Sequence, residues 1–123
     1  MTKKLTVLEL PIYRDYFPTF LEILNKLEEK LKTDSTHKLL IKKTYETVIE
    51  IFPNLNSGFN YWGTKGKLQI YNKVRMLLSK MQSQLHLLFE LQVFEKDYFE
   101  ELESSIRYLG GLIKKIEGLP NEK

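Results

Sequence analysis

Two sets of apolar residues in the second half of the sequence constrain the fold most. Within each set the spacing alternates between three and four residues, which places the members along one side of an α-helix. Only the short segment Gln92 to Asp97 separates the sets, so the chain must reverse there and the two helices must lie antiparallel. The first set is Tyr71, Val74, Leu78, Met81, Leu85 and Leu88, and the second is Phe99, Leu102, Ile106, Leu109, Ile113 and Ile116.

The first half of the sequence contains two further sets with the same spacing. They are Tyr13, Phe17, Phe20, Leu24, Leu27 and Leu31, followed by Ile41, Tyr45, Val48, Phe52, Leu55 and Phe59. Four amphipathic helices in a chain of 123 residues predict one all-α domain, an antiparallel up-down-up-down four-helix bundle. We expect the bundle over residues 11–117, with helices at about 11–32, 35–60, 67–91 and 95–117.

Proline, glycine and capping residues interrupt these sets. Pro18 indicates either a kink or a helix that begins near it, and Pro53 favours a bend in the second helix, which is expected to end somewhere between Phe52 and Asn60. Residues 1–10 are expected to form an extended arm or a frayed tail, and residues 118–123 a disordered tail. Cap residues are Thr33, Asp34 and Ser35, and the loop residues are Gly63, Thr64 and Gly66.

Composition bears mainly on the cellular setting. The sequence contains no cysteine, which excludes disulfides and thiolate metal sites and favours a reducing compartment. No stretch approaches the roughly 20 apolar residues of a membrane span. We therefore expect a soluble cytoplasmic protein without a membrane role.

Charge is distributed unevenly along the chain. The segment from Ile51 to Phe89 contains no Asp or Glu, although the net charge is only +3. Acidic residues gather instead around the turn between the last two helices, so one end of that helical hairpin is basic and the other acidic. The acidic group is Glu90, Glu95, Asp97, Glu100, Glu101 and Glu103.

Catalytic and metal-binding patterns are weak. His37 and His86 are expected at the surface without a nearby acid, and the pairs of adjacent glutamates are expected on solvated helix faces. The sequence has no Glu-x-x-His motif of the kind that binds iron in helical bundles. No catalytic residue, metal or cofactor is predicted.

Basic residues without acidic neighbours favour contact with a phosphate backbone, the alternative being an ordinary solvated face. Tyr61 and Trp62 are candidates for stacking on unpaired bases, the alternative being that they plug the end of the bundle. Outward apolar residues and a glycine pair suggest contact with a second copy of the chain. The predicted nucleic-acid residues are Lys38, Lys42, Lys43, Lys65, Lys67, Lys73, Arg75 and Lys80, and the predicted oligomer contacts are Met76, Phe89, Tyr108, Gly110 and Gly111.

The run from Leu88 to Ile116 resembles a known superfamily of four-helix bundles, with Tyr98 early in the last helix and Leu-Gly-Gly-Leu-Ile-Lys over residues 109–114. One branch is the accessory variability determinant of diversity-generating retroelements. The other is the bundle protein encoded in intervening sequences of bacterial large-subunit ribosomal RNA. The opening Leu10-Pro11-Ile12-Tyr13 is similar to the retroelement branch.

The resemblance to the retroelement branch implies a non-catalytic accessory protein. It implies a pentameric, basic homo-oligomer that binds the reverse transcriptase and its template RNA, or DNA or an RNA–DNA hybrid, through the outer surface of the bundle. The ribosomal-RNA branch implies instead a structural oligomer with no role in nucleic-acid binding. Both implications remain open at the level of the sequence.

Overall fold

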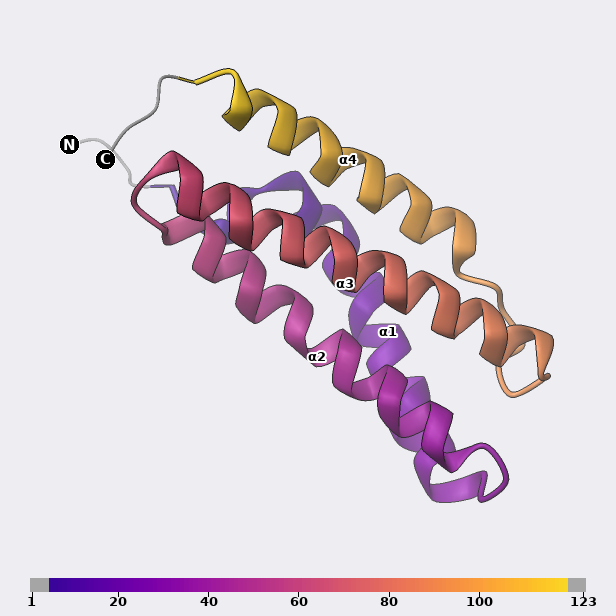
Figure 1. The fold of residues 1–123 in the computed structure, drawn as a ribbon. Helices are drawn as coiled ribbons and strands as arrows, with labels where there is room; N and C mark the ends of the chain where they lie inside the picture. Colours follow the sequence, from indigo (N-terminus) through magenta and orange to yellow (C-terminus); the bar gives the residue numbers. More distant parts are fainter. Residues whose placement is uncertain (1–4, 120–123) are drawn as a thin grey trace.

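The computed structural model describes residues 5–119, and over these residues the chain is a four-helix bundle (Figure 1). Consecutive helices run in opposite directions, which confirms the all-α, up-down-up-down fold predicted from the apolar spacing. A short 3₁₀ turn, η1, precedes the bundle, and no strand occurs within the described range. The elements are η1 (Val7–Glu9), α1 (Pro11–Thr33), α2 (Lys38–Asn60), α3 (Thr64–Glu90) and α4 (Phe99–Glu117).

Helix α3 packs against both α2 and α4, whereas α1 packs mainly against α2 (Figure 1). The connection between α2 and α3 lies at one end of the bundle, and the α1–α2 and α3–α4 connections lie at the other. Since α3 lies between two neighbours, its two flanks belong to two different grooves. This arrangement decides where the charged residues of α3 are found.

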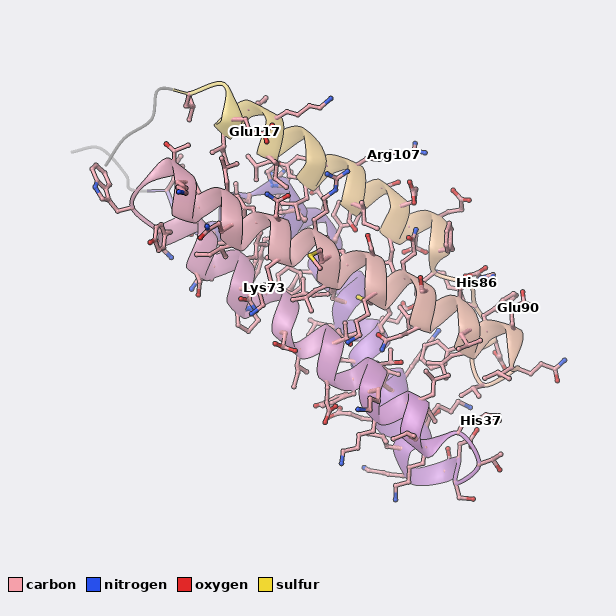
Figure 2. The ribbon with its side chains drawn as sticks, viewed as in Figure 1. His37, Lys73, His86, Glu90, Arg107 and Glu117 are labelled. Atoms are coloured by element: carbon pink, nitrogen blue, oxygen red, sulfur yellow. The ribbon has the colours of Figure 1, made fainter. Side chains whose placement is uncertain are left out.

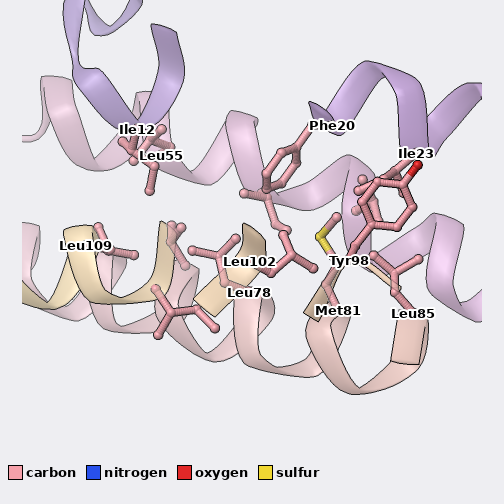
Figure 3. Close-up of a cluster of buried hydrophobic side chains, with 14 of the residues drawn as sticks. Ile12, Phe20, Ile23, Leu55, Leu78, Met81, Leu85, Tyr98, Leu102 and Leu109 are labelled. Carbon is pink, nitrogen blue, oxygen red and sulfur yellow. The ribbon is translucent and has the colours of Figure 1, made fainter. Parts of the chain in front are cut away.

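Apolar side chains from all four helices fill the core (Figure 3). The set predicted for α3 is fully buried, and so is that of α4 except for Phe99, which is 37% exposed because it lies at the first residue of the helix. In α1 and α2 the buried side is rotated from the predicted one. The buried residues there are Ile12, Phe20, Ile23 and Leu27 in α1, and Ile41, Thr44, Thr47, Val48, Ile51, Leu55 and Gly58 in α2.

Aromatic packing explains this rotation. Tyr13 stacks on Phe17 with ring centroids 4.8 Å apart, and both rings contact Phe52 of α2 edge-on at 4.7 and 5.0 Å. These large rings close the seam between α1 and α2 from the side rather than at its centre. The residues buried in these two helices are smaller, apart from Phe20, whose ring also contacts Phe52 edge-on at 4.8 Å.

Both internal prolines lie within continuous helices. Because α1 runs from Pro11 through Pro18, a helix beginning near Pro18 is wrong, and α2 likewise continues through Pro53 to Asn60. Each proline is exposed, and so is the residue four positions earlier whose carbonyl loses its helical partner. Water can satisfy those carbonyls, which reduces the cost of the interruption.

Three helix starts differ from the predicted positions. Helix α2 begins at Lys38 rather than residue 35, because the Asp34 carboxylate accepts a hydrogen bond from the His37 N–H (2.9 Å) and holds a turn there. Helix α3 begins at Thr64, so Gly66 is helical rather than part of the loop. Helix α4 begins at Phe99 rather than residue 95, because buried Val93 and Phe94 occupy the preceding segment.

Residues 7–9 form η1 rather than the predicted extended arm or frayed tail, although Thr6 and Leu10 on either side have extended backbone angles. Val7 of η1 is buried in the core. The predicted tail lies mostly outside the described residues, as do residues 1–4. Between residues 5 and 119, no helix combines the length and the apolar content needed to cross a membrane.

Candidate nucleic-acid interface

Lysines 73 and 80 lie on the flank of α3 that faces α2. Ile70 marks this flank, since a Cβ placed on Gly58 of α2 would lie 3.1 Å from its Cγ2 atom. Lys73 and Lys80 follow Ile70 by three and ten residues, so the helical repeat returns both to the same side. Both side chains are exposed beside the α2–α3 groove.

Arg75 lies on the opposite flank of α3, which faces α4. Gln82 marks that flank, because its side-chain amide donates to the Phe99 carbonyl (3.1 Å) and to Glu103 Oε1 (2.8 Å). Arg75 precedes Gln82 by two turns, and its guanidinium carbon lies 3.5 Å from the position a Cβ of Gly110 would occupy. The α3 cations therefore lie beside two separate grooves, one next to α2 and the other next to α4.

The α2 lysines divide in the same way. Tyr45, whose hydroxyl donates to Glu28 Oε2 (3.3 Å), marks the α1 side of α2. Lys38 and Lys42 precede Tyr45 by seven and three residues and share that side, away from α3. Lys43 precedes buried Thr47 by one turn and lies on the α3 side, so only Lys43 of the three extends the surface that carries Lys73 and Lys80.

Lys67 has a structural position. Its ammonium group donates to the carbonyls of Gly58 and Phe59, both at 2.8 Å, and lies 5.6 Å from the centre of the Tyr71 ring. These are the last carbonyls of α2, which a cation stabilises through the helix dipole. Burial lowers the pKa of Lys67. Its contacts within the chain leave it outside the exposed basic surface.

Four α3 cations carry no ion pair within residues 5–119: Lys65, Lys73, Arg75 and Lys80. Two cations near the acidic end are paired, Lys96 with Glu101 (2.6 Å) and Lys26 with Glu22 (3.6 Å). Four of the five α3 lysines and arginines are therefore available to an external anion, and Lys67 is the exception.

Helix α4 supplies two cations that the sequence analysis did not include, Arg107 and Lys114. Figure 2 shows Arg107 reaching outward from α4, with Lys73 on α3. Arg107 and Lys114 line a hollow of about 450 Å³ between α3 and α4, together with Asn72, Arg75, Gly110, Gly111, Ile113 and Glu117. The predicted antiparallel hairpin places the start of α3 opposite the end of α4. It could therefore have indicated that these α4 cations lie near Arg75.

Loop residues Tyr61 and Trp62 do not plug the end of the bundle. Trp62 is 75% exposed and Tyr61 48% exposed, and the Tyr61 ring lies over Gly66. Both line an open hollow of about 460 Å³ together with Phe59 and Lys67. An exposed indole beside a cation has the chemistry for stacking on a base, which stays a prediction.

The predicted oligomer contacts differ in exposure. Met76 is 73% exposed on α3, whereas Tyr108 packs partly against the core and Phe89 is also partly buried. No atom lies within 4 Å of a Cβ placed on Gly111, and the group nearest Gly110 is the Arg75 side chain. Among the described residues, no second helix therefore closes on the glycine pair.

Both histidines have acidic neighbours, which corrects the expectation that they have none. His37 Nδ1 lies 3.2 Å from Asp34, and His86 bridges Asp97 (3.0 Å) and Glu90 (3.8 Å) at the α3–α4 turn (Figure 2). These pairs join each histidine to its local turn. Within residues 5–119, no group of three or more histidine and carboxylate side chains is placed to hold a metal ion.

Tyr98 forms a polar link that the sequence analysis missed. Its buried hydroxyl donates to Glu22 Oε2 and accepts from Lys26 Nζ (2.6 Å), which ties the start of α4 to α1. Burial and the hydrogen bond to Glu22 raise the pKa of Tyr98, and the same hydrogen bond lowers the pKa of Glu22. This cluster joins α1 to the start of α4. The basic surface lies towards the other end of the bundle.

No known family, curated protein or solved structure matches this chain. The arrangement of charge on the helices therefore carries the functional argument.

Proposed function

We propose that this chain is a non-catalytic accessory protein of a diversity-generating retroelement, which binds the reverse transcriptase and its template RNA through a basic outer surface. The observation that carries the proposal is the unpaired charge of α3. Lys65, Lys73, Arg75 and Lys80 have no ion pair within the described chain, and no acidic residue occurs between Ile51 and Phe89. The resemblance of residues 88–116 to the retroelement branch supports the same assignment.

A polyanion explains this surface better than solvation alone. RNA gains affinity when cations displace the counterions held around its phosphates, and this gain is lost as the salt concentration rises. Separate grooves on the two flanks of α3 can contact separate phosphates of one strand. Lys67 is left out of the proposed contact set because its ammonium group is bound to the end of α2.

The test compares two double charge reversals in a fluorescence-anisotropy assay with the template RNA. Lys73→Glu with Lys80→Glu is expected to weaken RNA binding by about tenfold or more at 0.1 M salt and to reduce the salt dependence. The control, Lys38→Glu with Lys42→Glu, makes the same charge change on the α1 side of α2 and should have little effect. Equal losses in both variants would show that affinity follows net charge and would refute the assigned surface.

The reverse-transcriptase part of the proposal needs its own experiment. A reverse transcriptase encoded beside this chain should co-purify with it, including after nuclease treatment. Failure to co-purify, together with no RNA affinity, would refute the accessory role.

A structural oligomer of the ribosomal-RNA branch is the second candidate. The exposed Met76 side chain and the open space at Gly111 favour it, because both are suited to packing against another copy. Light scattering of the purified chain tests it. A stable oligomer without affinity for RNA or reverse transcriptase is the result expected for this candidate.

A further inference from the structure

The hollow between α3 and α4 gathers positive charge from two helices. Its lining includes three cations, Arg75, Arg107 and Lys114, and a single carboxylate, Glu117. We propose that this groove, which we call the α3–α4 groove, holds one phosphate of a single-stranded RNA. The inference rests on the proposed RNA binding and adds the place at which one phosphodiester is held.

The cations of the α3–α4 groove remain available to a ligand. Arg75 and Lys114 have no ion pair within residues 5–119, and Arg107 is paired with Glu103 at a long distance, with Nε 3.5 Å from Oε2. The terminal nitrogens of Arg107 are thus left for a second acceptor. Arginine presents several N–H donors in one plane, which suits the oxygens of a phosphate.

The backbone of α4 is open at the same place. A Cβ at Gly110 would lie 3.5 Å from the Arg75 guanidinium, and a Cβ at Gly111 would meet nothing within 4 Å. Glycine in a helix interior lowers helix stability, and no described part of the chain requires it at position 111. The missing side chains let a ribose-phosphate backbone approach the helix between the three cations.

The surrounding charge favours an RNA strand over a second helix as the occupant. An apolar helix packed on Gly111 would remove Arg75 and Lys114 from water without providing an opposite charge, which is unfavourable. A phosphodiester provides that charge and also bonds the N–H donors. A hollow of about 450 Å³ has room for a phosphate with its ribose.

The experiment measures binding of a labelled single-stranded RNA of about 12 nucleotides as a function of salt. Lys114→Glu is compared with Lys115→Glu, which makes the same change one residue later and lies outside the α3–α4 groove. Lys114→Glu should weaken binding about tenfold and reduce the slope of log affinity against log salt by about 0.7, whereas Lys115→Glu should leave the slope unchanged. Equal slopes for the two variants would overturn the proposal.

Gly111→Gln provides a second variant that does not depend on a charge change. The added side chain occupies the α3–α4 groove and replaces a helix-interior glycine, so the melting temperature should rise by a few degrees. RNA affinity should nevertheless fall by about threefold or more. A more stable variant with unchanged RNA affinity would overturn the proposal.

Other occupants give different results in the same assay. Saturable binding of inorganic phosphate that is lost in Lys114→Glu, while the RNA affinity of that variant is unchanged, would assign the groove to a free phosphate ligand, and loss of an oligomer in Gly111→Gln with unchanged RNA affinity would assign it to a second copy. Either result overturns the proposal. If RNA binds and depends on Lys73 and Lys80 alone, only the groove assignment fails, whereas no RNA binding by the unaltered chain refutes the proposed function itself.

Discussion

Gly58 of α2 tests how closely α2 and α3 pack, and Gly111 of α4 serves as the uncrowded reference. A Cβ on Gly58 would lie 2.7 Å from Cε1 and 2.8 Å from Cδ1 of Tyr71, whose side chain is only 2% exposed. Such distances are shorter than a carbon–carbon contact, so the buried ring or the α2 backbone must move. A Cβ on Gly111 of α4 would meet no atom within 4 Å. The same substitution by alanine therefore has opposite steric consequences at the two positions.

The expected magnitudes follow from two terms. Alanine in place of a helix-interior glycine stabilises a helix by about 0.5–1 kcal/mol. Overpacking of a filled core costs about 1–3 kcal/mol. Gly111→Ala should therefore raise the free energy of unfolding by up to about 1 kcal/mol, whereas Gly58→Ala should lower it by up to about 2 kcal/mol.

Thermal and urea unfolding followed by circular dichroism measure the difference. For a chain of this length, 1 kcal/mol corresponds to about 4 °C in melting temperature, so Gly111→Ala should melt about 4–12 °C above Gly58→Ala. Gly110→Ala is a useful intermediate case, because its nearest contact, to the Arg75 guanidinium, is an ordinary 3.5 Å. A Gly58→Ala variant as stable as Gly111→Ala would refute the close packing of α2 on the Tyr71 ring.

Three further changes test separate parts of the structure. Lys67→Met should lower the free energy of unfolding by about 1–2 kcal/mol, because the last α2 carbonyls lose their donor. RNA affinity should stay within about twofold. Unchanged stability with a larger loss of RNA affinity would place Lys67 in the RNA interface. Gln92→Gly should stabilise the chain by about 0.5–1 kcal/mol, since Gln92 has φ 63° in the α3–α4 turn; urea unfolding showing a loss would contradict this. Burial raises the pKa of Tyr71 to about 12, so this side chain ionises first in the unfolded chain and its contribution alone should lower stability by about 1.4 kcal/mol per pH unit from pH 10 towards 12. Tyr71→Phe should remove about one proton from that dependence, and an unchanged pH dependence of urea unfolding would show that Tyr71 titrates normally.

The apolar spacing predicted the central helix best. All six residues of the α3 set are buried. In α1 and α2 the spacing alone did not fix the buried side, although α2, like α3, packs against two neighbouring helices. Tyr13 and Phe52 fit the periodic pattern, but their rings cover the edge of the seam, which depends on the shape of the neighbouring helix.

The turns depended on features that residue type does not reveal. The α3–α4 turn has a Schellman arrangement, in which Gln92 N–H bonds the Phe89 carbonyl and Val93 N–H bonds the Leu88 carbonyl, both at 2.9 Å. Glycine is the usual residue at that positive φ, so glutamine gives no signal there. Buried Tyr98 was equally difficult to predict, since its partners Glu22 and Lys26 lie on a different helix.

The candidate site was predicted as a run of charge in the sequence, and the helical repeat divides that run. Lys73 and Arg75 are two residues apart, which turns them about 200° from each other around α3. One therefore lies beside α2 and the other beside α4. Residues of α4 such as Lys114 lie beside the α3 cations only because α3 and α4 are antiparallel. They could therefore be assigned to the site only once the packing of α4 on α3 was known.

The interior of the bundle gives a physical reason to place ligand binding outside. Polar residues buried in the described core are bonded locally: Thr44 and Thr47 donate to carbonyls one turn earlier in α2, and Ser105 donates to the Leu102 carbonyl. Gln82 uses its amide group to join α3 to α4. The buried hydroxyls are thus bonded within their own helices and Gln82 joins two helices, whereas Lys65, Lys73, Arg75 and Lys80 of α3 have no ion pair within residues 5–119. A polyanion recognised on the outside needs no rearrangement of the core, and so its affinity should change with salt while the melting temperature of the bundle changes little.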